Sequence, residues 1–382
     1  MLEHPPIRIA FCHYTADVCG GSDRSLYNLV TRLPARGITP VLLLKTGDPM
    51  AAEYRACGLE VHELPFFPPR RALEWGKLLR FFLYFWPTVF RLVWLMRRHR
   101  VDLAHVNTVN NIQGGVAAWL ARKPLVWHVR ELVPASRSAA AVNALACRLS
   151  TAMIANSGAV AATLKHPRVH IIHNGIDLDL FETLPPRAQV RNELQIAADA
   201  PVIAVVGRLE AWKGQHVFIE AIPEILRAHP AARFLVVGGS AVNKPEYLPQ
   251  LKARSVELGV DEAVCFSGIR KDIPAVLSAT DVLVLPSVTP EPFGLTLIEA
   301  MAAGVPVVAT AQGGPLEIVE DGKSGVLIAP DNAGALARAV VALLAEPEQR
   351  EAMGRYARRR AFERFSLDRV GREAEQVFRE CL

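Results

Sequence analysis

Short apolar runs rich in β-branched residues alternate along the whole chain with longer segments of helical periodicity. In the N-terminal half these runs read IRIAF, VLLL, LAHV, LVWH, AMIA and VHII, and in the C-terminal half VIAVV, FLVV, VCF, VLVL and VVA. Runs with no polar alternation are typical of parallel strands buried on both faces. The pattern therefore predicts βαβ units and an α/β fold.

One stretch interrupts this rhythm. Residues 182–201, ETLPPRAQVRNELQIAADAP, are polar and contain adjacent prolines, and the strand pattern restarts at Val202. A chain of 382 residues is also long enough for two domains. We therefore predict two doubly wound, Rossmann-like domains facing across a cleft, residues 1–182 and residues 200–362. An amphipathic helix at 363–382, with no strand after it, is expected to pack back on the N-terminal domain.

Neither half carries G-x-G-x-x-G after its first strand, which disfavours a nicotinamide enzyme. The N-terminal half instead has Gly20-Gly21 followed by Ser22, a predicted N-cap, and by a helical apolar face. Paired glycines at a helix start allow close backbone approach to an anion, which the helix N-terminus favours. The pair is either a phosphate site or a tight turn.

Two cations follow the first strand of the C-terminal half, in VVGRLEAWKG. Ligands of doubly wound sheets bind at the carboxyl ends of strands, so Arg208 and Lys213 are candidates to neutralise a diphosphate there. The alternative is that both are solvated loop charges. A lysine at such an edge is expected to contribute little to folding.

The segment PEPFGLTLIEA, residues 290–300, places Glu291 before a predicted helix from Leu295 to about Ala303 and Glu299 inside it. Eight helical positions span about 12 Å. Glycosidase carboxylate pairs stand about 5 to 9.5 Å apart. The spacing therefore indicates two contacts on one extended ligand, with a further anion site at the first helix amides.

Charge is unevenly distributed. The net charge is +5, but residues 1–185 contain 21 Lys/Arg against 13 Asp/Glu, so the basic character belongs to the N-terminal half. Because the chain has no recognisable nucleic-acid-binding motif, binding to nucleic acid is disfavoured.

Six scattered cysteines without a C-x-x-C pair argue against zinc and disulfides and favour a reducing, cytoplasmic location. The N-terminal MLEHPPIRIAF lacks the layout of a signal peptide.

Residues 72–100 mix large aromatics with arginine and lysine. Their longest uncharged run, Phe81 to Phe90, is too short for a spanning helix, which needs about 18 residues or more. The segment is either an interfacial helix on anionic lipid, or a groove for a lipid-linked acceptor, or a plain surface helix of the N-terminal sheet.

Taken together, EPFGLTLIEAMAAGVPVVAT, GRLEAWKG, SGIRKDIPAVLSATDVLVLPS, HNGIDLDLF and the Gly-Gly loop resemble the retaining glycosyltransferases of family 4, which have the GT-B fold. The resemblance is strong from Val202 to Leu344 and rests on fewer anchors before that. It implies a donor-binding C-terminal domain and an acceptor-side N-terminal domain.

The resemblance assigns roles to individual residues. It implies that Glu291 binds donor-sugar hydroxyls, that Glu299 binds the ribose, and that Arg208 and Lys213 neutralise the donor diphosphate. Backbone groups near Ile269 would contact the nucleobase. The amides expected to hold sugar and phosphate oxygens are those around Phe293, Gly294, Leu295 and Thr296.

The family's N-terminal histidine best matches His128 in LVWHVRE, with His105 in LAHVNT as the rival and a core histidine as the alternative for both. Asp177-Leu178-Asp179 is a D-x-D triplet, and in other glycosyltransferases such a triplet binds a metal. Here it matches the family's post-strand turn, so no metal and no cofactor are expected. Attack from the front face of the sugar would require no protein nucleophile.

The function implied is transfer of a sugar from a nucleotide diphosphate donor to a glycan or lipid-linked acceptor, in bacterial cell-surface polysaccharide synthesis. We expect a cytoplasmic location at the inner face of the membrane and no nucleic-acid partner. Two alternatives remain open at this point, an epimerase-like GT-B enzyme and a non-catalytic nucleotide-sugar-binding module.

Overall fold

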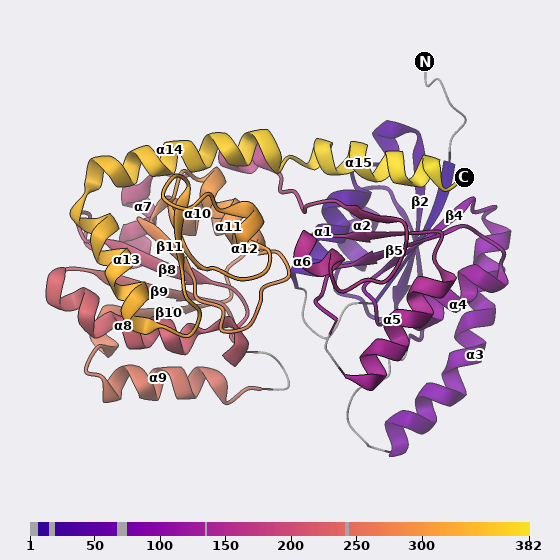
Figure 1. Ribbon diagram of the computed structural model, residues 1–382, viewed down its shortest axis with the longest axis horizontal. Coiled ribbons are helices and arrows are strands. Elements are labelled where there is room, and N and C mark those ends of the chain that lie inside the picture. Colours follow the sequence, from indigo (N-terminus) through magenta and orange to yellow (C-terminus); the bar gives the residue numbers. More distant parts are fainter. Residues whose placement is uncertain (1–6, 15–19, 67–74, 134–135, 241–243) are drawn as a thin grey trace. The chain divides into compact units, whose positions relative to one another are not determined.

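The computed structural model describes residues 7–14, 20–66, 75–133, 136–240 and 244–382, with only the backbone for residues 75–82. The chain divides into two compact units, Met1–Asn174 with Leu367–Leu382, and Gly175–Ser366. Each unit is built on one parallel sheet with helices on both faces (Figure 1). The predicted α/β fold with two Rossmann-like sheets is therefore confirmed.

The sheet of the first unit has seven strands in the order β3-β2-β1-β4-β5-β6-β7. Their bounds are β1 Ile7–His13, β2 Ile38–Lys45, β3 Glu60–Leu64, β4 Leu103–Asn107, β5 Leu125–Val129, β6 Ala152–Ala155 and β7 Val169–Ile171. Side chains alternate across it: Ile9 and Phe11 of β1 join one buried cluster, whereas Ala10 and Cys12 join the other.

Helices cover both faces of this sheet. They are α1 Gly21–Val30, α2 Ala51–Ala56, α3 Trp75–Arg98, α4 Ile112–Leu120, α5 Arg137–Leu149, α6 Gly158–Ala161 and α15 Leu367–Glu380. The buried cluster on one face takes side chains from α1, α2 and α15, and the cluster on the other takes them from α3, α4 and α5. The chain therefore returns to its first unit through α15 (Figure 1).

The sheet of the second unit has six strands in the order β10-β9-β8-β11-β12-β13. Their bounds are β8 Val202–Val206, β9 Arg233–Val237, β10 Val264–Gly268, β11 Val282–Leu285, β12 Val307–Thr310 and β13 Gly325–Ile328. The helices are α7 Arg187–Glu193, α8 Gln215–Ala228, α9 Tyr247–Glu257, α10 Ile273–Ser278, α11 Leu295–Ala302, α12 Pro315–Ile318, α13 Ala333–Ala345 and α14 Pro347–Arg364.

The segment connecting the two sheets is anchored in the second unit. Arg191 of α7 is buried, donates to the Ala279 carbonyl at 3.2 Å and pairs with Asp281 at 2.9 Å. Because Asp281 also accepts from the Val202 amide at 2.8 Å, this carboxylate fixes both α7 and the start of β8. The polar stretch 182–201 therefore contributes to the packing of the second unit.

Candidate functional site

The candidate residues of the second unit stand just beyond the carboxyl ends of its strands. Arg208 follows β8, Ile269 follows β10 and Glu291 lies in the loop after β11. This loop forms an isolated bridge to Gly313, which follows β12. In a parallel sheet all these loops open at one edge, so the topology collects residues that are far apart in the sequence.

The centre of this edge is an ion pair between Lys213 and Glu291. Lys213 Nζ lies 2.9 Å from Glu291 Oε1 and 2.7 Å from Oε2, and the Ser287 hydroxyl donates to Oε2 at 3.0 Å. Trp212 covers the lysine, with Nζ 4.2 Å from the ring centroid. The two residues that the sequence treats as separate ligand contacts thus hold one another in place.

This pairing corrects the expectation that Lys213 contributes little to folding. The Glu291 side chain is 8% exposed and that of Lys213 is 19% exposed. Removing one partner of a buried ion pair leaves an uncompensated charge, which costs about 3–5 kcal/mol. Lys213 therefore supports the Glu291 loop as well as offering a positive charge.

Arg208 is more accessible. Its side chain is 43% exposed, and its Nε lies 3.3 Å from Glu210 Oε2. The same carboxylate oxygen accepts from Trp212 Nε1 at 2.7 Å. Arg208 is thus held by one carboxylate oxygen at the edge of the sheet, and its guanidinium stays accessible to an anionic ligand.

The loop that carries Glu291 leads into α11. Gly294 caps this helix at a φ of 107°, a conformation that suits glycine, and the amides of Leu295 and Thr296 open the first turn. Phe293, 2% exposed, anchors the loop against Phe365, with ring centroids 6.2 Å apart. The predicted helix start at Leu295 is confirmed.

A second glycine pair, Gly313 and Gly314, supports the same loop and was not among the predicted site residues. Gly314 donates its amide to the Glu291 carbonyl at 2.8 Å. A Cβ at Gly313 would lie 2.2 Å from that carbonyl oxygen, and one at Gly314 would lie 2.4 Å from Phe293. The available signal was the AQGGP stretch directly after an apolar run, which marks a close backbone approach.

The remaining donor candidates flank this centre. Glu299 is half-buried on α11, and Ile269 is 72% exposed after β10. The Ile269 side chain packs over Gly239, where an added Cβ would come within 2.9 Å of it. The backbone of residue 269 therefore lies beside an exposed apolar side chain and a glycine.

In the first unit, polar side chains form a buried chain of hydrogen bonds at the carboxyl ends of β1, β4 and β5. His13 pairs with Asp23 at 2.7 Å and accepts from Asn107 at 3.0 Å. Arg130 donates to Asn107 and to Asn174, both at 2.6 Å. Burial lowers the pKa of Arg130 to about 10, which leaves the guanidinium charged at neutral pH.

His128 lies at the end of this network and is 2% exposed. Its Nδ1 faces His105 Nε2 at 3.2 Å and the Arg130 guanidinium at 3.4 Å. Burial, with the positive charge of Arg130 next in importance, lowers the pKa of His128 well below its ordinary value. A neutral ring whose Nδ1 accepts carries its proton on Nε2. That nitrogen is buried and has no hydrogen-bond partner among the described residues.

His105, the rival candidate, is fully buried and packs against Phe11 and Phe378, with centroids 4.8 Å and 5.9 Å from its ring. It stands within β4, whereas His128 is the penultimate residue of β5. In this position His105 orients His128 through their shared hydrogen bond.

The glycine pair at residues 20 and 21 starts α1 as expected, but the predicted N-cap is wrong. Gly20 is the N-cap and Gly21 the first helical residue, which places Ser22 inside the helix. The Gly20 amide donates to Asp23 at 2.6 Å. Because Asp23 also pairs with His13, the helix start is tied to the polar network rather than to Ser22.

Two family models account for most of the chain. The model described as Glycosyltransferase Family 4 matches residues 19–180, and the model described as Glycosyl transferases group 1 matches residues 186–360. The chain belongs to glycosyltransferase family 4. The resemblance stated from its motifs is thereby confirmed.

Curated relatives of this family 4 chain include two actinobacterial enzymes. The D-inositol 3-phosphate glycosyltransferase of Corynebacterium urealyticum is 35% identical over 56% of this chain and 51% of its own length. The GDP-mannose-dependent alpha-(1-6)-phosphatidylinositol monomannoside mannosyltransferase of Mycolicibacterium smegmatis is 35% identical over 54% of each chain. The chain thus spans about half the length of the curated relatives that it matches.

Among solved structures, Anabaena HepE, crystallised in complex with UDP and glucose, superposes on the family 4 chain with a TM-score of 0.86. The two are 26% identical, and the match covers 97% of this chain and 99% of HepE.

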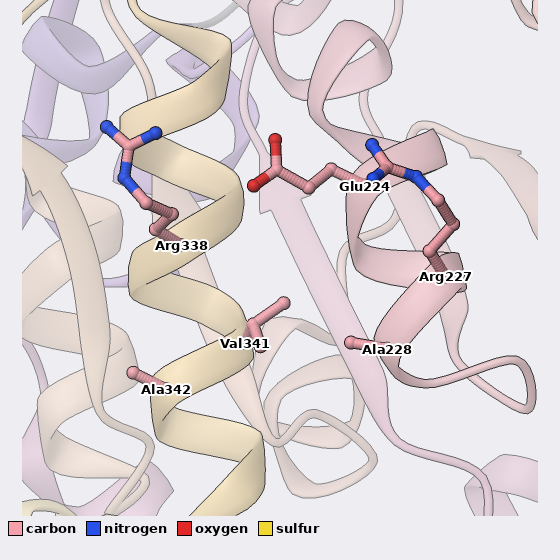
Figure 2. A pocket seen from close by; sticks show the side chains of 6 residues that line it. All are labelled: Glu224, Arg227, Ala228, Arg338, Val341 and Ala342. Carbon is pink, nitrogen blue, oxygen red and sulfur yellow. The ribbon is translucent and has the colours of Figure 1, made fainter.

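Other features of the family 4 chain lie apart from these residues. A shallow hollow between α8 and α13 contains none of the candidate residues (Figure 2). It is lined by Glu224, Arg227, Ala228, Arg338, Val341 and Ala342. None of the helices in the described ranges combines the length and apolarity needed to span a bilayer.

Proposed function

We propose that this chain is a retaining glycosyltransferase that moves a sugar from a nucleotide diphosphate donor to a glycan or lipid-linked acceptor. The observation that carries the proposal is the cluster of Lys213, Glu291 and Arg208 beside the first amides of α11. A cation pair, a carboxylate and free helix amides suit the diphosphate and the sugar of one extended ligand. HepE, which shares the fold over nearly its whole length, was crystallised with UDP and glucose.

In this proposal the cations perform the main catalytic task. Negative charge builds up on the leaving diphosphate as the glycosidic bond breaks, and preorganised donors stabilise it most effectively. Arg208 and Lys213 supply that stabilisation without a metal ion or other cofactor. Glu291, positioned by Lys213 and Ser287, accepts from sugar hydroxyls, and Glu299 accepts from the ribose.

His128 acts as a neutral hydrogen-bond donor. Its Nε2–H is unpaired within the described residues, and burial beside Arg130 opposes protonation of the ring. Such a group can bind a hydroxyl of the transferred sugar, but a ring with so low a pKa is a poor base for the acceptor's proton. The acceptor proton therefore passes to the departing phosphate during front-face attack.

We further place the acceptor at an anionic membrane surface, contacted through α3. One face of this helix is exposed and apolar, with three aromatic side chains: Leu83, Trp86, Phe90 and Trp94 are between 52% and 61% exposed. Arg91, Arg97, Arg98 and Arg100 are exposed along the same segment. Aromatic residues flanked by arginine match the headgroup region of anionic lipid. The pattern supports a lipid contact; work at the inner face of the membrane and in cell-surface polysaccharide synthesis is proposed from the family resemblance.

Donor binding is tested by a thermal-shift panel of UDP-, GDP- and ADP-sugars. A ligand present at 100 times its Kd stabilises the folded state by about 2.7 kcal/mol, so one nucleotide class should raise the Tm measurably. The Glu299→Ala variant should lose this shift, whereas Arg254→Ala, an exposed residue of α9, should retain it. A folded chain that no nucleotide sugar stabilises would contradict the proposal.

A further inference from the structure

A cluster of two imidazoles and one carboxylate lies on the first unit, apart from the polar network. Glu60 and His62 belong to β3, the edge strand of the sheet, and His99 directly follows α3. Successive strand residues point to opposite faces, so Glu60, His62 and Leu64 share one face. Leu64 packs in the cluster that contains Leu92 and Met96 of α3, which identifies that face as the one toward α3.

The chain geometry holds His99 in place. Its amide donates to the Leu95 carbonyl at 2.9 Å, and its own carbonyl accepts from Arg8 at 3.2 Å. Arg100 then takes a left-handed φ of 50°, and Val101 bonds back to Met96 at 2.9 Å. This closed helix end directs the His99 ring toward the edge strand.

The three side chains converge on one carboxylate oxygen. Glu60 Oε1 lies 2.9 Å from His62 Nε2 and 3.0 Å from His99 Nδ1. All three ligand atoms lie within 4.8 Å of one another. The side chains are partly accessible, with exposed fractions of 38% for Glu60, 30% for His62 and 15% for His99.

These distances fit a metal-ligand set. Bonds of about 2.0–2.1 Å to zinc in tetrahedral geometry separate neighbouring ligand atoms by about 3.3 Å. Two of the separations are therefore within a few tenths of an ångström of the required value, and small side-chain rotations would admit the ion. Two histidines and a carboxylate leave a fourth position for water.

We propose that Glu60, His62 and His99 bind a divalent transition-metal ion, with Zn²⁺ as the best match. Imidazole nitrogens suit zinc, copper and nickel, whereas Mg²⁺ requires oxygen ligands and octahedral geometry. The bound ion would tie the edge strand β3 to the carboxyl end of α3. The positive charges of Arg8 and Arg98 beside His99 limit the affinity.

The test is isothermal titration calorimetry of the untagged full chain with Zn²⁺, and with Mg²⁺ as the hard-ion control. The wild type should bind one equivalent of Zn²⁺ that His62→Gln and His99→Gln both lose. Removing a residue that only hydrogen-bonds to a metal ligand already lowers metal affinity about 10- to 100-fold. Removing a ligand itself should lower the affinity at least as much. His229→Gln, at the end of α8, is the matched control and should bind as the wild type does.

Glu60→Gln serves as a second variant of nearly unchanged shape, and the Tm of each variant without metal shows whether it is folded. Zn²⁺ binding that is the same in all cluster variants would overturn the proposal. So would a wild type that binds no Zn²⁺ at up to about 1 mM. Neither readout depends on glycosyl transfer, so this inference and the proposed function can fail separately.

Discussion

Lys213 and Glu291 each serve folding and ligand binding. Because the Glu291 carboxylate is nearly buried and bonds both Lys213 and Ser287, a change at any of the three alters the loop before α11. Arg208 differs, since its side chain is 43% exposed and lies 3.3 Å from only one oxygen of Glu210, and ion pairs with an accessible partner contribute only about 0–1 kcal/mol to stability. Replacing Arg208 should therefore change the rate of transfer while leaving the stability of the fold nearly unchanged.

The buried histidines predict a loss of stability in acid. Burial lowers the pKa of His105 and of His128 well below 6.5, so below that pH the unfolded chain binds protons that the native chain does not. As the pH is lowered below 6.5, the free energy of unfolding should therefore decrease by about 1.4 kcal/mol per pH unit for each histidine. Urea unfolding at about pH 7.5 and about pH 5.5 measures this difference.

The comparison variant is His105→Gln with His128→Gln, which should flatten the pH dependence. Glu131 acts in the opposite direction, because burial raises its pKa and the native state then binds the extra proton. Comparing variants removes that contribution. Equal slopes in the double variant and the wild type would show that the two rings are not held neutral.

Among the elements, α3 combines the surface-helix and interfacial alternatives that the sequence leaves open. One face, including Val89, Leu92 and Met96, is buried against the sheet. The opposite face exposes Phe90 and Trp94, and Arg98 lies over the Trp94 ring at 5.1 Å. Packing on the sheet thus leaves the aromatic face available for a lipid surface.

We expect replacement of Arg97, Arg98 and Arg100 by alanine to weaken binding to anionic liposomes. Each basic residue near such a surface contributes about 1 kcal/mol, so the three together should cost about 100-fold in affinity, less at high salt. Cosedimentation with vesicles of anionic and of neutral lipid measures this. The control is a second triple alanine variant, at Arg227, Arg355 and Arg359, which are exposed in the second unit. If both triple variants bind alike, α3 makes no specific lipid contact.

Two strands escaped prediction for physical reasons. β3 reads EVHEL, with charged and imidazole side chains on one face, because an edge strand need not bury both faces. β13 reads GVLI, which is short and begins at a glycine, and a Cβ at Gly325 would lie 2.4 Å from the Val307 carbonyl oxygen. The internal strands β1, β8 and β11 were predictable because both of their faces are apolar.

For the whole molecule, the order of the strands decides which residues meet. β8 pairs with β11, which brings Lys213 to Glu291, and β4 pairs with both β1 and β5, which brings Asn107 between His13 and His128. The sequence shows that each of these residues follows or ends an apolar run, but not which strands are neighbours. Individual candidates were therefore predictable, whereas their pairing was not.

The same limit hid the cluster on β3. Glu60 and His62 are neighbours on one strand face, but His99 reaches them only because α3 runs back along the edge of the sheet. The expectation of no zinc site rested on the scattered cysteines and could not include this contact between histidines and a glutamate. The family motifs give no help there, since none of them includes Glu60, His62 or His99.

The proposed activity is measured by transfer from a nucleotide sugar to a lipid-linked or glycan acceptor. NMR follows the loss of donor and identifies the anomer of the new glycosidic bond. We predict that the wild type transfers with retention and that Arg208→Ala lowers kcat about 10²–10³-fold, as expected for loss of one charge-stabilising donor. Arg254→Ala, with a similarly exposed side chain and its own surface ion pairs, should transfer normally. Equal rates in Arg208→Ala and the wild type would rule out its role at the diphosphate, and an inverted product would rule out a retaining mechanism.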